Sequence, residues 1–239
     1  MKIKILIIIF CFLFFHQAVA QFSSGKITYE RKTNLYKKFK DDYVREWIKE
    51  ADKIKIDFFE LHFNDSQSLF QPTESNLKEK YGWATDKNTV FQNQNDRSRF
   101  TIKVIWGEKV SIRDSLYTRK WKITESKRTI CGYSCRKAIW EANDSTTIYA
   151  WYCDEIIPGI GPESFIGLPG AILGLATEDG GVVYFAKAVE FTKPFPEIFI
   201  VPKSKDKVYT NSELKSKLEK EFGKEKWGKT MIKNVFGYW

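Results

Sequence analysis

The sequence predicts a mainly β protein with a single antiparallel sheet, an amphipathic helix after the first strand and a C-terminal helix. Three observations lead to this fold class. Short segments rich in aromatic and β-branched residues, several with period-two alternation, follow one another along most of the chain. The connections between them are too short for repeated helical crossovers, so neighbouring strands are expected to run antiparallel. Helical periodicity is confined to two stretches, one near each end.

The chain is predicted to open with a strand and a helix. Residues 25–33 alternate with period two, which indicates a strand. Phe39, Tyr43 and Trp47 then recur every four residues, a spacing typical of an amphipathic helix, which we expect over residues 35–51. Further strands are predicted over residues 53–64, 67–71, 89–92, 99–105, 109–113, 120–125, 137–142, 146–153, 171–177 and 181–192.

A second helix is predicted over residues 211–222. Thr210 and Glu213 have the spacing of a capping box, in which each residue satisfies a free backbone N–H group of the other. Leu214 and Leu218 follow four residues apart and share one face of the helix. The sheet is therefore expected to be followed by a helix with one apolar side.

The N-terminus has the pattern of a secretion signal. Lys2 and Lys4 precede an apolar run over residues 5–15, and small residues follow from Ala18 to Ala20. This order of a charged, an apolar and a small-residue region is the one that signal peptidase recognises. We expect cleavage after Ala20, which would place the protein in the periplasm or outside the cell.

The rest of the chain, residues 21–239, is predicted to form one β-rich domain without a transmembrane segment, because it contains no apolar run of about 18 residues. Hydrophobic residues make up 43% of the sequence, which excludes intrinsic disorder. The net charge is +9, but basic residues alternate with acidic ones and form no basic motif. A nucleic-acid partner is therefore not expected, whereas weak attraction to anionic membrane surfaces is.

Three cysteines follow the signal, and export would place them where disulfides can form. Residues 143–145 read as the loop of a hairpin, so that Ala142 pairs with Thr146. In that register Cys135 lies opposite Cys153 on the same face, and we expect these two residues to form a disulfide. A two-residue loop would shift the register by one and separate the two sulfurs.

Other states of the cysteines stay open. A bridge between Cys131 and Cys135 would close a very tight ring, and all three thiols could be free. A zinc site would need His62, the only histidine after the signal, or an unusual carboxylate such as Asp154 or Glu155. We expect neither a metal nor a cofactor.

The most informative segment spans residues 150–175 and contains two Pro-Gly pairs. In each pair the proline presets φ for the second position of a type II turn, and the glycine supplies the positive φ of the third. This predicts turns at Pro158-Gly159 and at Pro169-Gly170. The two turns would frame the residues between them rigidly.

This segment resembles the signature of the GLPGLI family, secreted proteins of Gram-negative bacteria. The signature has AWY, here residues 150–152, then Gly161-Pro162, then a string that here is residues 167–172, with Ala171 where the family name has Leu. The resemblance also covers residues 25–29 and 135–138. It implies an exported protein whose genes often lie near outer-membrane transport genes. The chain is also similar to the bowl-shaped amino-terminal module of some bacterial peptide-N-glycanases, which implies a strongly curved sheet, a bowl or half-barrel.

Two interpretations of the segment compete. Gly- and Pro-rich turns beside aromatic strands are usually architecture. Alternatively, small residues let a partner or ligand approach the backbone while large side chains anchor it. On the second interpretation, the binding residues are Trp151, Tyr152, Gly161, Pro162, Glu163, Phe165, Gly167, Leu168, Pro169 and Gly170.

We expect no catalytic activity. The glycine-rich segment lacks the Gly-Lys-Ser/Thr of a phosphate loop, and Asp154, Glu155 and Glu163 lack the spacing of a calcium loop. His62 is expected on the polar face of a strand without an evident nucleophile. The remaining functions are a carrier of an apolar or extended ligand, which requires a cavity, and an accessory protein of an outer-membrane transporter or other envelope protein, which requires an exposed apolar patch. A hydrolase would require polar groups converging in a cleft.

Overall fold

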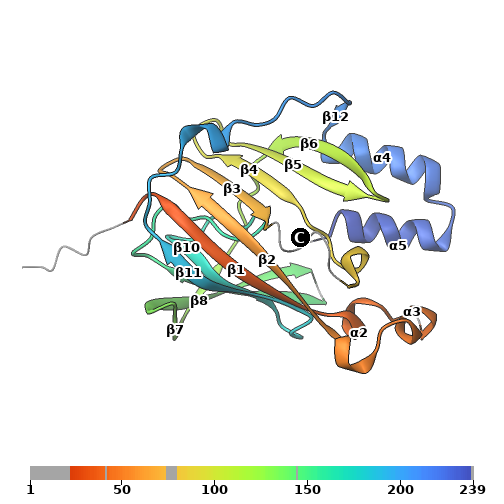
Figure 1. Cartoon of the computed structure of the whole chain (residues 1–239), viewed down its shortest axis with the longest axis horizontal. Coiled ribbons are helices and arrows are strands. Elements are labelled where there is room, and N and C mark those ends of the chain that lie inside the picture. The colour runs from red at the N-terminus through yellow and green to blue at the C-terminus, as the bar shows by residue number, and fades with distance from the viewer. Residues whose placement is uncertain (1–21, 41, 74–79, 144, 238–239) are drawn as a thin grey trace, which may run out of the picture.

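The computed structural model describes residues 22–40, 42–73, 80–143 and 145–237, so the predicted signal peptide lies outside the described residues. Twelve strands in this part of the chain form one sheet in the order β12-β6-β5-β4-β3-β2-β1-β11-β10-β9-β8-β7. Figure 1 shows that the sheet curls strongly, so that β3 to β6 face β7 to β11 across a hollow. The sheet does not close, because β12 and β7 are its two free edges.

All strand pairs are antiparallel except β12 with β6, which is parallel. The predicted mainly β class with one antiparallel, curved sheet is thus confirmed. The strands are β1 (Gly25–Asn34), β2 (Ile54–Phe63), β3 (Gln67–Pro72), β4 (Thr89–Asn93), β5 (Ser98–Ile105), β6 (Glu108–Ser115), β7 (Lys122–Ile130), β8 (Tyr133–Asn143), β9 (Thr146–Cys153), β10 (Ala171–Thr177), β11 (Val182–Glu190) and β12 (Val208–Tyr209).

The helical region after β1 is broken where one helix over residues 35–51 was predicted. It contains α2 (Leu35–Lys38), α3 (Asp42–Glu46) and the 3-10 turn η1 (Glu50–Asp52). Helix α2 ends because Phe39 has an extended backbone, with φ −102° and ψ 111°. Two of the aromatic residues that suggested the apolar face, Tyr43 and Trp47, are instead 68% and 65% exposed.

The C-terminal helix is confirmed as α4 (Asn211–Phe222), and both bonds of its capping box are present. A second helix, α5 (Lys226–Val235), was missed in the sequence, although Trp227, Met231 and Val235 recur every four residues and indicate an apolar helix face. Leu214, Leu218 and Ile232 of the two helices pack on Ile105 and Ile112 of the sheet. Two further 3-10 turns are η3 (Gly82–Ala84) and η4 (Pro196–Phe199).

The hairpin of β8 and β9 has the predicted register but a different loop. Arg136 lies opposite Tyr152, as expected. However, Asn143 rather than Ala142 pairs with Thr146. A bulge between Glu141 and Asn143 restores the predicted register for the rest of the hairpin, because an unpaired residue compensates for the shorter loop.

The predicted disulfide is absent, and that prediction is wrong. Cys135 and Cys153 are free thiols with no exposed surface, and both belong to the main core. The Cys135 Sγ lies 3.6 Å from the carbonyl oxygen of Tyr133 on its own strand. Burial raises the pKa of Cys135 to about 12. Placing two cysteines on one buried face therefore does not by itself provide the geometry that a disulfide requires.

Candidate functional site

A row of polar side chains crosses the inner face of the sheet at one end of its central strands. Along β1, Ile27, Tyr29 and Arg31 all point inward and are buried. Arg31 lies directly opposite Asp57 of β2 on one side and Tyr184 of β11 on the other. The inner face is therefore apolar at one end of β1 and charged at the other.

Arg31 is held by partners on both neighbouring strands. Its Nη2 donates to Asp57 Oδ2 at 2.7 Å, and its Nη1 donates to the Tyr184 hydroxyl at 3.2 Å. The guanidinium also lies over the Phe59 ring, 4.6 Å from its centre. Burial alone would lower the pKa of Arg31, but Tyr184 and Asp57 raise it instead. Arg31 is therefore a fixed cation.

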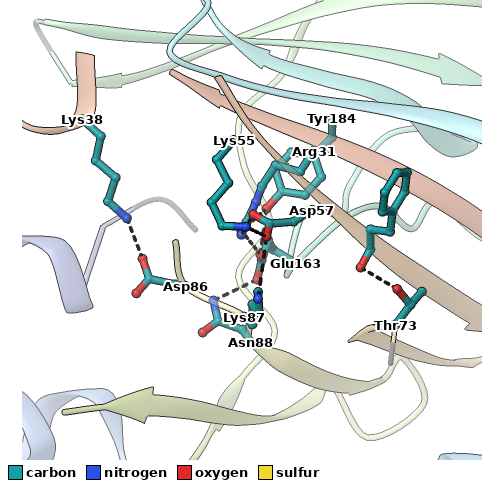
Figure 2. A network of polar contacts seen from close by, with 11 residues as sticks. Arg31, Lys38, Lys55, Asp57, Thr73, Asp86, Lys87, Asn88, Glu163 and Tyr184 are labelled. Carbon is teal, nitrogen blue, oxygen red and sulfur yellow. Dashed lines mark hydrogen bonds and ion pairs between the residues drawn. The ribbon is translucent and has the colours of Figure 1, made fainter. Parts of the chain in front are cut away.

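Asp57 has no exposed surface and gathers cations around its carboxylate (Figure 2). Lys55, two residues earlier on the same face, donates to Oδ1 at 2.9 Å, and the Nζ of Lys87 lies 3.8 Å from the same oxygen. Burial works to raise the pKa of Asp57, but Arg31 and Lys55 hold it below its ordinary value. Asp57 is therefore ionised and compensated.

Glu163 joins this row from the loop between β9 and β10. Its Oε1 accepts a hydrogen bond from the Tyr184 hydroxyl at 2.8 Å, and its Oε2 accepts one from Asn88 Nδ2 at 3.0 Å (Figure 2). Its backbone has φ 57°, a left-handed conformation that is uncommon for a residue other than glycine and often marks a functional position. Burial raises the pKa of Glu163 despite the nearby Arg31.

Two cavities adjoin this polar row inside the hollow. The larger, of about 560 Å³, lies between β4 to β6 on one side and the loop that carries Glu163 on the other. The smaller, of about 480 Å³, reaches Arg31 and Thr33. Phe236 and Gly237, which follow α5, line both cavities.

The two cavities have a basic lining. Seven cationic side chains line them, against four carboxylates. In the larger cavity the cations are Arg99, Lys103 and Arg119, and the carboxylates are Asp114 and Glu163. Ligand pockets typically have volumes of roughly 300–1,000 Å³ and a few charged groups, so these cavities have the size of a small-molecule site.

Residues 150–175, which contain the two Pro-Gly pairs, are called the Pro-Gly segment below. Most of the candidate binding residues in this segment are buried. Tyr152, Gly161, Pro162, Phe165 and Leu168 lie inside the protein, and so do Glu163 and Gly170; Trp151 is half-buried, and Gly167 and Pro169 are exposed. Of the ten, only Glu163 lines one of the two cavities. The other nine line neither, and their role in binding stays a prediction.

The glycines of this segment are required by close backbone contacts. The predicted type II turns are wrong, because neither Gly159 nor Gly170 has a positive φ. A Cβ on Gly170 would lie 1.9 Å from the carbonyl oxygen of Cys153, and one on Gly159 would lie 2.0 Å from that of Leu168. Packing of one chain segment against another, rather than turn geometry, explains these two positions.

The polar row was missed in the sequence, although a signal was present. Within β2, Lys55 and Asp57 share the parity of Phe59 and Leu61, so the apolar face of this strand continues into charged residues. On β1, Arg31 likewise occupies an inward position that continues the series of Ile27 and Tyr29. Charged residues at inward positions of adjacent strands indicate a buried polar site.

The part of the chain that the structure describes contains no group of three or more side chains that could together hold a metal ion. Nor does any helix within it have the length and apolar character needed to cross a membrane.

Comparisons with known proteins give a family match for one segment of the chain and structural neighbours for its fold. Residues 140–174 match a family model described as a protein of unknown function (Porph_ging), a region that includes most of the Pro-Gly segment. No curated protein matches the chain. The match shows a known family signature at that place in the chain, while the name GLPGLI stays a resemblance.

The fold resembles two solved structures of PNGF-II, in space groups P21 and C2. Each has a TM-score of 0.55 and 18% sequence identity, and they cover 78% and 88% of this chain. The matched region is 31% and 32% of the PNGF-II chains, so this chain spans about a third of their length. At this identity the likeness shows the fold alone: an open, curved β-sheet.

Proposed function

We propose that this chain is an exported protein of the bacterial cell envelope that binds a ligand in the hollow of its sheet. The observation that carries the proposal is the pair of adjoining cavities, of about 560 and 480 Å³, beside a buried charged row. Concave sites of this size with a few convergent charged groups are typical of small-molecule binding sites. The N-terminal secretion pattern supports export.

Binding without catalysis is the simpler interpretation of the polar row. Asp57 is compensated by Arg31 and Lys55, and both oxygens of Glu163 accept hydrogen bonds within the protein. Each carboxylate is therefore already bound by groups of the protein. This arrangement suits a rigid wall of a binding site better than proton transfer to a substrate.

Native mass spectrometry of the exported, purified protein tests this proposal. We expect a bound small molecule that is released on unfolding. Thr101→Phe, a substitution on the wall of the larger cavity, should reduce its occupancy several-fold, because the ring fills space that the ligand needs. Thr129→Phe, at an exposed position of β7 outside both cavities, is the matched control. An unliganded wild type, or equal occupancy in both variants, would argue against a ligand in the larger cavity.

An accessory role at an outer-membrane transporter or other envelope protein is the second candidate. Tyr43, Trp47 and Trp83 are each more than 60% exposed and lie in the region of α3 and η3. Exposed aromatic residues of this kind often anchor interfaces. Crosslinking from Trp47 in the intact envelope, with an exposed site on β7 as the control, would identify such a partner and distinguish this role from binding in the hollow.

A further inference from the structure

Arg119, which precedes β7, is the most unusual cation of the larger cavity. It is 6% exposed and lines the cavity wall. Its guanidinium lies 3.8 Å from the ring centre of Phe165, 4.9 Å from that of Trp140 and 5.5 Å from that of Tyr117. Its Nη1 donates to the carbonyl oxygen of Ser164 at 2.9 Å. Aromatic rings and one backbone group therefore hold the guanidinium in place.

No carboxylate neutralises Arg119 within the described part of the chain. It forms no ion pair there, and its buried Nε has no hydrogen-bond partner. Burial, together with the neighbouring Arg99, lowers the pKa of Arg119 to about 10. A buried charge without a counter-ion is costly, and protein structures normally compensate it. Arg119 therefore presents a positive charge at the cavity wall with no neutralising carboxylate among the described residues.

Other charged side chains on the wall of the larger cavity add to its positive charge. Arg99 reaches Asp114 only at 4.0 Å, and that carboxylate also accepts a hydrogen bond from the backbone N–H of Asn211 at 2.9 Å. Lys103 donates to the Val235 carbonyl oxygen at 2.7 Å, and burial lowers its pKa. The cavity's other carboxylate, Glu163, already accepts hydrogen bonds from Tyr184 and Asn88. The wall of the larger cavity thus carries three cations and two carboxylates.

We propose that the larger cavity binds an organic anion, whose carboxylate or phosphate group lies against Arg119 and whose apolar body fills the rest of the space. This inference rests on the proposed function. Guanidinium groups suit both carboxylates and phosphates, because their N–H groups match two oxygens at once. The remaining wall includes apolar side chains, among them Val90, Ile112, Leu116 and Trp140. At about 560 Å³ the cavity is far larger than inorganic phosphate requires, so the ligand carries an apolar body.

Isothermal titration calorimetry with three probes tests the inference: decanoate, decyl phosphate and the neutral alcohol 1-decanol. We expect the two anions to bind the wild type at least tenfold more tightly than decanol, since a charge-assisted hydrogen bond contributes about 1.5–3 kcal/mol. Arg119→Gln should weaken anion binding by about tenfold or more on the same grounds. Arg119→Lys should recover part of the affinity, because it keeps the charge but loses the planar geometry.

Arg128→Gln is the matched control. Arg128 also lies over aromatic rings, 4.9 Å from the centre of Trp151 and 5.0 Å from that of Phe185, but it is exposed and outside the cavity. Its replacement should leave anion binding unchanged. Arg99→Gln provides a second test within the cavity if Arg119→Gln unfolds. It should weaken the binding of both anions and leave the binding of decanol unchanged.

Unchanged anion affinity in folded Arg119→Gln would overturn the inference, as would equal binding of decanol and decanoate. In the second case a ligand still occupies the hollow, so the proposed function survives. If none of the three probes binds the wild type, the inference fails for this class of anion. The native mass spectrum then decides separately whether another ligand is bound.

Discussion

The two ends of the inner face of β1 and β2 differ in what covers them. At one end Ile27 and Leu61 belong to the main core, and the Tyr29 hydroxyl donates to the Ile172 carbonyl oxygen of β10 at 2.6 Å. At the other end Arg31 and Asp57 are also buried, but they form a charged pair, and Arg31 lines the smaller cavity. Strand β1 therefore contributes both to the core and to a cavity wall, while Asp57 of β2 holds Arg31 in place.

This difference shows how one sheet serves two purposes. Where the Pro-Gly segment closes over the hollow, its glycines allow backbones to approach so closely that no space remains. Where that cover ends, the strands carry charged residues that must be compensated within the row. Stability should accordingly depend on packing at one end and on electrostatics at the other, and the following predictions separate the two.

The largest effect is expected for Asp57→Asn. This substitution removes the carboxylate that binds both Arg31 and Lys55 and leaves Arg31 only the more distant Glu163, at 3.8 Å, so it should destabilise the protein by about 3–5 kcal/mol. Urea unfolding measures the change. The control is Glu60→Gln on the outer face of the same strand, where the ion pair with Lys26 is long at 3.8 Å and partly exposed. Its loss should cost about 1 kcal/mol or less. Equal losses would contradict the assigned role of the buried row.

A somewhat smaller effect is expected at the packed end for Gly170→Ala. The added Cβ would lie 1.9 Å from the Cys153 carbonyl oxygen, so the backbone must move, and a loss of about 1–3 kcal/mol is typical of such overpacking. At Gly82 a Cβ meets no atom within 4 Å, and Gly82→Ala should change stability little. Thermal unfolding of both variants compares them. A Gly170→Ala variant as stable as the wild type would show that the Pro-Gly segment is not closely packed.

The two carboxyl groups of the charged row should respond to pH with opposite signs. The pKa of Asp57 lies below its ordinary value of 3.8, so the stability that it contributes is present above pH 3.8 and is lost as the pH falls through the folded-state pKa. The pKa of Glu163 lies above 4.5, so the folded state favours its protonated form, and stability falls as the pH rises from 4.5 through the raised value.

Urea unfolding between about pH 3 and pH 8 checks this pair of signs. The stability difference between wild type and Asp57→Asn should shrink at the acid end. The difference between wild type and Glu163→Gln should fall as the pH rises above 4.5. Parallel pH profiles for the two variants would mean that Glu163 is compensated as fully as Asp57.

The smallest effect concerns the thiols, which are expected to react at different rates in the native protein. Burial raises the pKa of all three thiols, but Cys131 is exposed, whereas Cys135 and Cys153 are buried. Alkylation by iodoacetamide requires the thiolate, so Cys131 should be labelled first. Peptide mass spectrometry reports the order. Early labelling of Cys135 would show that the packed end opens readily.

The strands could be predicted from sequence because alternation and short loops act locally. Strands β9 and β10 have the predicted bounds, and the capping box of α4 is where Thr210 and Glu213 placed it. The break after α2 could not be predicted from periodicity, because tertiary packing buries Leu35 and Ile48 and leaves Trp47 in solvent. Here tertiary contacts overrode the helical pattern.

For the candidate site, the sequence indicated one member, Glu163, for the wrong reason. Its place between two Pro-Gly pairs suggested an exposed surface, whereas the loop turns its carboxylate inward to Tyr184 and Asn88. These contacts join residues 21 and 75 positions apart, and no local pattern reports such distances. Arg119 was equally hidden, because a single arginine before a strand carries no sign of its burial.

The most direct test of a ligand site in the hollow is an NMR titration with decanoate that follows arginine Nε–H and tryptophan indole N–H signals. We expect the signals of Arg119 and Trp140, which line the larger cavity, to shift in a saturable way, while those of the exposed Trp47 and Trp83 stay constant. Shifts at Trp47 and Trp83 without shifts at Arg119 and Trp140 would contradict the account, because the ligand would then bind the outer surface instead of the hollow.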